Sequence, residues 1–149
     1  MRLWLIVLLV FFGAVSPALA NTALFDQVEA KSGKPLALEQ RYQLALAIKA
    51  YTDVQRERDE LLVGEIARLT LLPAPQILFL AQQGGSLLAK IEVLLKRKLP
   101  AGDAQQVNAA AAARQTALQA AREKLVSRVA AIGGLSAQAA REILPKFGL

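Results

Sequence analysis

The sequence predicts an all-α protein, a small helical bundle in which two long antiparallel helices pack across several short ones. Alanine and leucine dominate the 149 residues, and aromatic residues make up only 5% of the chain. Apolar residues recur at intervals of three and four, which is the helical period, and no stretch sustains the alternation typical of a strand. Proline and glycine then divide the chain into segments at 32–35, 72–75, 83–86, 99–103 and 133–134.

These breaks predict six helices. Pro75 suits the first turn of a helix, Ser86 and Asp103 suit N-cap positions, and Gly133-Gly134 suits a helix end. Because two of the segments are long, we expect them to form an antiparallel pair. The expected ranges are 22–31, 36–70, 75–82, 87–98, 104–132 and, after Ser136, 137–146.

Residues 1–20 have the three parts of a cleavable secretory signal peptide. Arg2 supplies the positive charge, the run from Leu3 to Val15 is apolar, and Ala18-Leu19-Ala20 matches the small residues before a signal-peptidase site. The alternative, an uncleaved membrane anchor, needs about 20 apolar residues, and the run here stops short of that length. We therefore expect an exported protein, periplasmic in a Gram-negative source and otherwise extracellular, with one domain at 21–149.

Composition removes several kinds of chemistry. The chain has no cysteine and no histidine, so cysteine catalysis and thiolate zinc sites are excluded, and the commonest acid–base residue is missing. We expect no metal and no cofactor. Residues 71–149 carry 10 basic and 4 acidic side chains, but few aromatic residues lie among the cations to stack on bases, which argues against nucleic acid.

Arginine interrupts the apolar stripe of both long segments. At about 100° per residue, Gln55 and Arg58 lie within the stripe of 36–70, while Arg114 lies within that of 104–132 and Arg122 near its border. A buried charge is costly unless it is paired. We therefore single out Gln55, Arg58, Arg114 and Arg122 as candidate ligand-binding residues, and no residue as catalytic.

Three accounts could satisfy these arginines. They could pair with carboxylates such as Asp59 or Glu65 across the helix interface and fix its register. They could instead converge with Gln55 on an anionic ligand, because guanidinium groups suit carboxylates and phosphates. Either side chain could also extend its charged end to water.

Lys96, Arg97 and Lys98 form a small basic cluster at the expected end of a helix. Cations there complement the helix dipole. The same three side chains could form a surface patch for anionic lipid, polyanionic glycan or an acidic partner.

One short stretch resembles a known family. Arg56-Glu57-Arg58-Asp59-Glu60-Leu61-Leu62 is similar to a segment of the helical chorismate mutases. The resemblance implies an all-helical fold with arginines and a glutamine that bind a dicarboxylate. It covers seven of 149 residues, and the basic residues that this family carries earlier in its first long helix have no counterparts at matching spacing here.

Together these features predict a non-catalytic exported protein that binds another envelope protein, as an adaptor, an immunity or inhibitor protein, or a chaperone-like module. One alternative is a small-anion-binding protein or mutase-like enzyme that uses the arginines inside the bundle. A further alternative is association of the basic second half with an anionic lipid or glycan surface.

Overall fold

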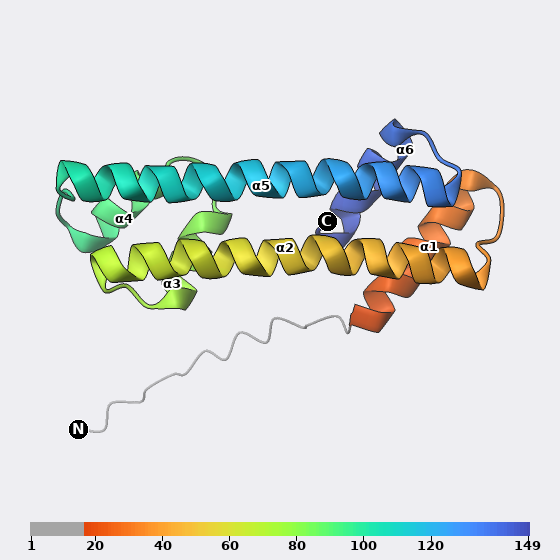
Figure 1. Cartoon of the computed structure of the whole chain (residues 1–149), viewed down its shortest axis with the longest axis horizontal. Helices are drawn as coiled ribbons and strands as arrows, with labels where there is room; N and C mark the ends of the chain where they lie inside the picture. The colour runs from red at the N-terminus through yellow and green to blue at the C-terminus, as the bar shows by residue number, and fades with distance from the viewer. Residues whose placement is uncertain (1–16) are drawn as a thin grey trace, which may run out of the picture.

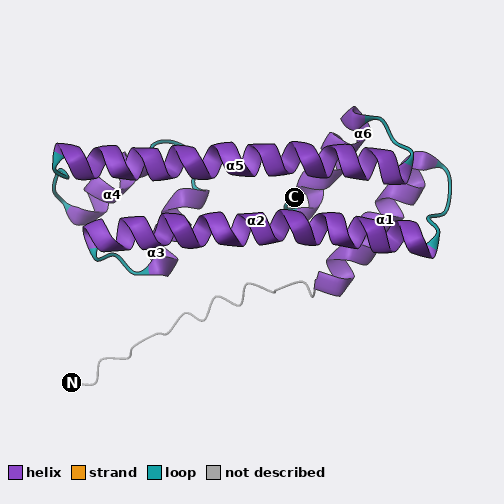
Figure 2. Ribbon diagram, viewed as in Figure 1, coloured by secondary structure: helices purple, strands orange, loops and turns teal. Residues whose placement is uncertain are grey.

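The structure, a computed structural model, describes the backbone of residues 17–149 and the side chains from residue 21 onward. Helices account for most of this part of the chain, which contains no strand, so the predicted all-α class is confirmed (Figure 2). The predicted signal peptide falls mostly on residues 1–16, outside the described residues. The elements are α1 (Pro17–Ser32), α2 (Leu38–Thr70), α3 (Ala74–Gln82), α4 (Leu87–Leu95), α5 (Ala101–Gly133), α6 (Ala137–Ile143) and a 3₁₀ turn, η1 (Leu144–Phe147).

The two 33-residue helices, α2 and α5, lie side by side and run in opposite directions (Figure 1). At one end of the pair, Gln40 near the start of α2 donates a 2.8 Å hydrogen bond to the carbonyl of Ile132 near the end of α5. At the other end, Arg68 donates a 2.7 Å hydrogen bond to Gln106. At 1.5 Å per residue, each helix is about 50 Å long.

The short helices cover only one face of this pair, and they do so at its two ends. In Figure 1 the long pair lies in front; α3 and α4 lie behind one end, and α1 and α6 behind the other. We call the opposite face of the pair, which no helix in residues 17–149 covers, the open face. Within the same residues no single helix is long and apolar enough to span a membrane, although α2 and α3, bent by 116° at their junction, meet that test as a pair.

The apolar core is split in two. The first core joins α1, α6 and the adjacent ends of the long helices, with Val28, Leu44 and Val129 buried in it. The second joins α3, α4 and the other ends, where Ile66 and Ile77 are buried. No residue at 49–61 of α2 or at 108–124 of α5 is buried. We call these two spans the waist of the molecule.

Of the two predicted N-caps, Ser86 is confirmed and Asp103 is wrong, and Ser136, which directly precedes the last expected helix, is also an N-cap. The hydroxyl oxygens of Ser86 and Ser136 accept hydrogen bonds from the backbone of Ala89 and Ala139, as N-caps do. Asp103 is not a cap, because the extended backbone of Pro100 starts α5 earlier; Asp103 instead lies in the first turn, where its charge complements the helix dipole.

Several predicted helix bounds also needed correction. The helix expected to reach residue 98 ends at Leu95, because Lys96 adopts a left-handed conformation with φ 53° and ends α4. Helix α1 begins at Pro17, five residues before the expected start, and α5 begins at Ala101. Gly134 ends α5 in a left-handed conformation, as predicted for that glycine pair.

A glutamate fixes the loop at the start of each long helix. Glu29 accepts hydrogen bonds from the backbone of Leu36 (2.8 Å) and from Arg41 (2.6 Å), and these bonds, that of Leu36 first, hold its pKa below the ordinary value of 4.5. Glu92 accepts from Lys98 (2.6 Å) and from the backbone of Leu99 (3.1 Å), which lower its pKa in the same way. In both loops the amide lies seven residues after the carboxylate.

These two carboxylates predict a pH dependence of stability. A carboxyl whose pKa is lower in the folded chain stabilises it above the unfolded pKa, near 4.5, and loses that contribution as pH falls through the folded value. The variant E29Q/E92Q should therefore lose less stability than the wild type between pH 7 and pH 3. Urea unfolding at each pH measures this difference, and parallel curves for the two proteins would contradict it.

Two glycines in the long helices predict opposite effects on stability. A Cβ at Gly133 would lie 2.6 Å from Cγ1 of Val28, which is fully buried, so Gly133→Ala should destabilise the protein by about 1–3 kcal/mol. A Cβ at the exposed Gly64 meets nothing within 4 Å, so Gly64→Ala should stabilise α2 by about 1 kcal/mol. Thermal unfolding of both variants tests the pair, and equal shifts would contradict the close approach of α1 to α5.

Candidate functional site

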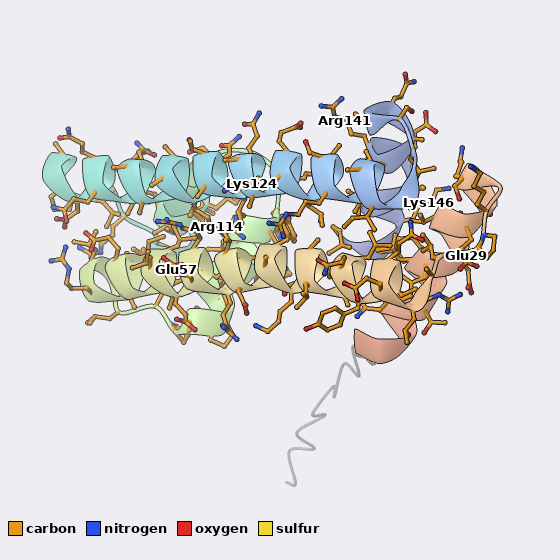
Figure 3. The ribbon with its side chains drawn as sticks, turned by 45° about the vertical axis from the view of Figure 1, so that its right-hand side comes forward. Glu29, Glu57, Arg114, Lys124, Arg141 and Lys146 are labelled. Carbon is orange, nitrogen blue, oxygen red and sulfur yellow. The ribbon has the colours of Figure 1, made fainter. Side chains whose placement is uncertain are left out.

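An ion pair bridges the two long helices at the waist. Nε of Arg114 on α5 donates a 2.6 Å hydrogen bond to Oδ1 of Asp59 on α2. The two side chains are 15% and 19% exposed, and Figure 3 shows Arg114 between the two ribbons. Arg114 therefore pairs with a carboxylate across the helix interface, as the first of the three explanations for these arginines expected.

Arg58 has a different environment. Its Nε is buried without a hydrogen-bond partner, the one such side-chain atom in the described residues. The nearest carboxylate oxygen belongs to its neighbour Glu57, 3.9 Å from Nη2, and 38% of the Arg58 side chain is exposed. This guanidinium therefore lacks the close carboxylate that Arg114 has, and its buried N–H carries an uncompensated desolvation cost.

Three hollows surround the waist and separate the predicted residues. A hollow of about 730 Å³, which we call the central groove, is lined by Arg114 and Arg122 of α5 and by the segment that joins α3 to α4. A second, of about 400 Å³ between α2 and α3, is lined by Gln55 and Asp59. Arg58 lines none of the three hollows, so the four predicted residues do not meet in one site.

The third hollow, of about 530 Å³, is lined only by residues of α2 and α5. On α5, Lys124 and Arg128 line it, whereas Val126, about 200° round the helix from each, packs into the core beside α1 and α6. This hollow therefore lies on the open face, and we call it the open-face groove. Its floor is made mostly of small or apolar side chains: Ala47, Ala50, Tyr51, Val54, Ala120, Ala121 and Leu125.

Sequence reasoning did not single out Lys124 and Arg128, which line the open-face groove. Neither makes an ion pair within the described residues, although nine pairs occur there. The available signal was their spacing of four, on the same side of the helix as Ala117 and Ala121. This pattern indicates a basic border along a smooth alanine surface.

The basic cluster at residues 96–98 lies at the end of the molecule, away from the waist. All three side chains are exposed. Lys98 pairs with Glu92 at 2.6 Å and Lys96 forms the C-cap of α4, so two of the three residues have structural roles. Within residues 17–149, no group of three metal-ligating side chains comes together.

The waist ion pair predicts a non-additive effect of substitution. Asp59→Leu alone leaves the Arg114 charge without its partner, and we expect a loss of about 2–3 kcal/mol, below the value for a fully buried pair because water reaches both side chains. The double variant D59L/R114L should recover most of this loss. Urea unfolding of the wild type, both single variants (D59L and R114L) and the double variant gives the coupling energy, and additive losses would show that the pair does not couple the helices.

The comparisons with known proteins add no relative. No protein-family model matches the chain, and neither a curated protein nor a solved structure is significantly similar to it.

Proposed function

We propose that this chain is an exported, non-catalytic helical module that binds an acidic helical segment of another envelope protein in the open-face groove. The single observation that carries the proposal is the groove itself, a hollow of about 530 Å³ with an alanine-rich floor on a face that no helix in residues 17–149 covers. Small side chains let a partner helix approach closely, as in grooves that bind an amphipathic helix.

The charges around this groove argue for an acidic partner. Lys124 and Arg128 line it without ion pairs of their own in the described chain, whereas Glu123, the one carboxylate in its lining, is paired with Arg141 at 2.7 Å. Arg58 lies four residues after Val54 on α2, at the spacing that places two side chains on one side of a helix. Because its guanidinium has no carboxylate closer than 3.9 Å, a partner carboxylate would supply the missing contact.

Export rests on the first twenty residues. The positive Arg2, the apolar run to Val15 and the small residues Ala18 and Ala20 are typical of a signal peptide. Cleavage after Ala20 removes the first turn of α1 and leaves Leu24 and Val28, the two side chains at 21–32 that are buried, in the remaining chain. The partner would therefore be an envelope or secreted protein.

Site-specific photocrosslinking in the native cell envelope tests the proposal. A crosslinking residue at Ala121, in the groove, should capture one protein through an acidic helical segment identified by mass spectrometry. The same residue at Ala109, which is exposed and lines none of the three hollows, should not capture it.

Charge reversal supplies the matched comparison. We expect K124E/R128E to weaken binding of the identified partner by about tenfold or more, because rim charges steer association. The variant K96E/R97E changes the net charge equally at the far end of the molecule and should bind normally. Equal capture from Ala109, capture of a second copy of this chain, or loss of binding only in K96E/R97E would overturn the proposal.

A further inference from the structure

We infer that the central groove, on the opposite side of the long pair from the open face, is a binding site for a small aliphatic carboxylate. The groove lies at the waist between α5 and the segment that joins α3 to α4. Its volume of about 730 Å³ falls within the range of about 300–1,000 Å³ that is typical of small-molecule sites.

The charge of the lining favours an anion. Arg114 and Arg122 are its only ionisable residues apart from Tyr51, and no carboxylate lines it. Nε of Arg114 already donates a hydrogen bond to Asp59. The two terminal nitrogens of Arg114 make no hydrogen bond within residues 21–149 and are not among the buried unpartnered atoms, so they remain accessible to solvent.

Arg122 is the free cation of this groove. Its side chain is exposed and makes no ion pair or hydrogen bond with the described residues. A guanidinium presents donors in a fork that matches the two oxygens of a carboxylate. Arg122 can therefore hold the carboxylate at the rim. Arg114, whose charge is balanced by Asp59, offers the hydrogen-bond donors of its terminal nitrogens.

The remaining lining suits an aliphatic body. Leu80, Ala81, Ala111 and Leu118 line the groove and are only half-buried, so they present apolar surface to it, above the nearly fully buried Leu62 and Leu87. Leucine side chains offer apolar contact without directional demands. Gln115 and Gln119 on α5 add amide groups that can hydrogen-bond the rest of a polar head.

The segment that joins α3 to α4 forms one wall of the groove and is held in place by hydrogen bonds within the chain. Nζ of Lys90 donates to the backbone carbonyls of Leu80 (3.0 Å) and Gln83, and Ser86 caps the helix that follows. Binding therefore does not require this segment to become ordered, which lowers the entropic cost of association.

An NMR titration with octanoate tests the inference, with octan-1-ol as the uncharged probe of the same body. The sample for this titration is the protein as it is exported by cells that express the whole chain. We expect saturable shifts confined to the amides of residues 80–87 and 115–122, with octan-1-ol binding at least about tenfold more weakly because it cannot pair with the guanidinium.

Arg122→Gln should weaken octanoate binding by about tenfold. The matched variant Arg128→Gln removes the same charge from the same helix on the open face and should bind as the wild type does. Equal affinity for octan-1-ol, an equal loss in both variants, or displacement of octanoate by an equal concentration of inorganic phosphate would overturn the assignment of a carboxylate site, as would the absence of saturable shifts.

Discussion

The ion pair between Arg114 and Asp59 is the constraint that joins the two long helices at the waist of this molecule. The two cores lie at the ends of the long helix pair, and the waist between them contains no buried apolar residue that could set how α2 and α5 align. A slip of one residue along either helix turns its side chains by about 100° and would separate Nε of Arg114 from Oδ1 of Asp59, which are 2.6 Å apart. The pair thus adds a directional contact to the register at the waist, while the two cores fix it at the ends.

That register places two different surfaces back to back. On one face, α5 and the segment that joins α3 to α4 enclose the central groove. On the other face, no helix of residues 17–149 covers the alanine-rich groove beside Lys124 and Arg128. The two surfaces share the long helices but have separate cations, so one charge on each face can be altered without disturbing the other.

Much of the fold was predictable because it depends on local rules. Ser86, Ser136 and Gly134 act at helix ends, where short-range hydrogen bonds decide the conformation. Pro100 and Lys96 show where such rules fail: an extended proline starts α5 before Asp103, and a left-handed lysine ends α4 early. Glycine and asparagine favour that left-handed conformation, so a lysine there gives little warning in the sequence.

The candidate site was less predictable than the fold. A helical projection placed Arg58 and Arg114 on equivalent apolar stripes, yet only Arg114 meets a carboxylate across the interface. The projection gives the angle of a side chain about its own helix and says nothing of how far the other helix is rotated. That Arg114 lines a hollow and Arg58 lines none of the three also depends on the short helices, whose positions are set by contacts distant in sequence.

The division of the core has a mechanical consequence. Within residues 17–149, the assembly of α1 and α6 at one end and that of α3 and α4 at the other are connected only through α2 and α5. These two antiparallel helices are each about 50 Å long. Each assembly has its own buried cluster and can in principle open as a separate cooperative unit. A helix bound along the open face would contact α2 and α5 at the waist, between the two units. It would therefore hold the middle of both long helices and reduce the independent opening of the two end assemblies.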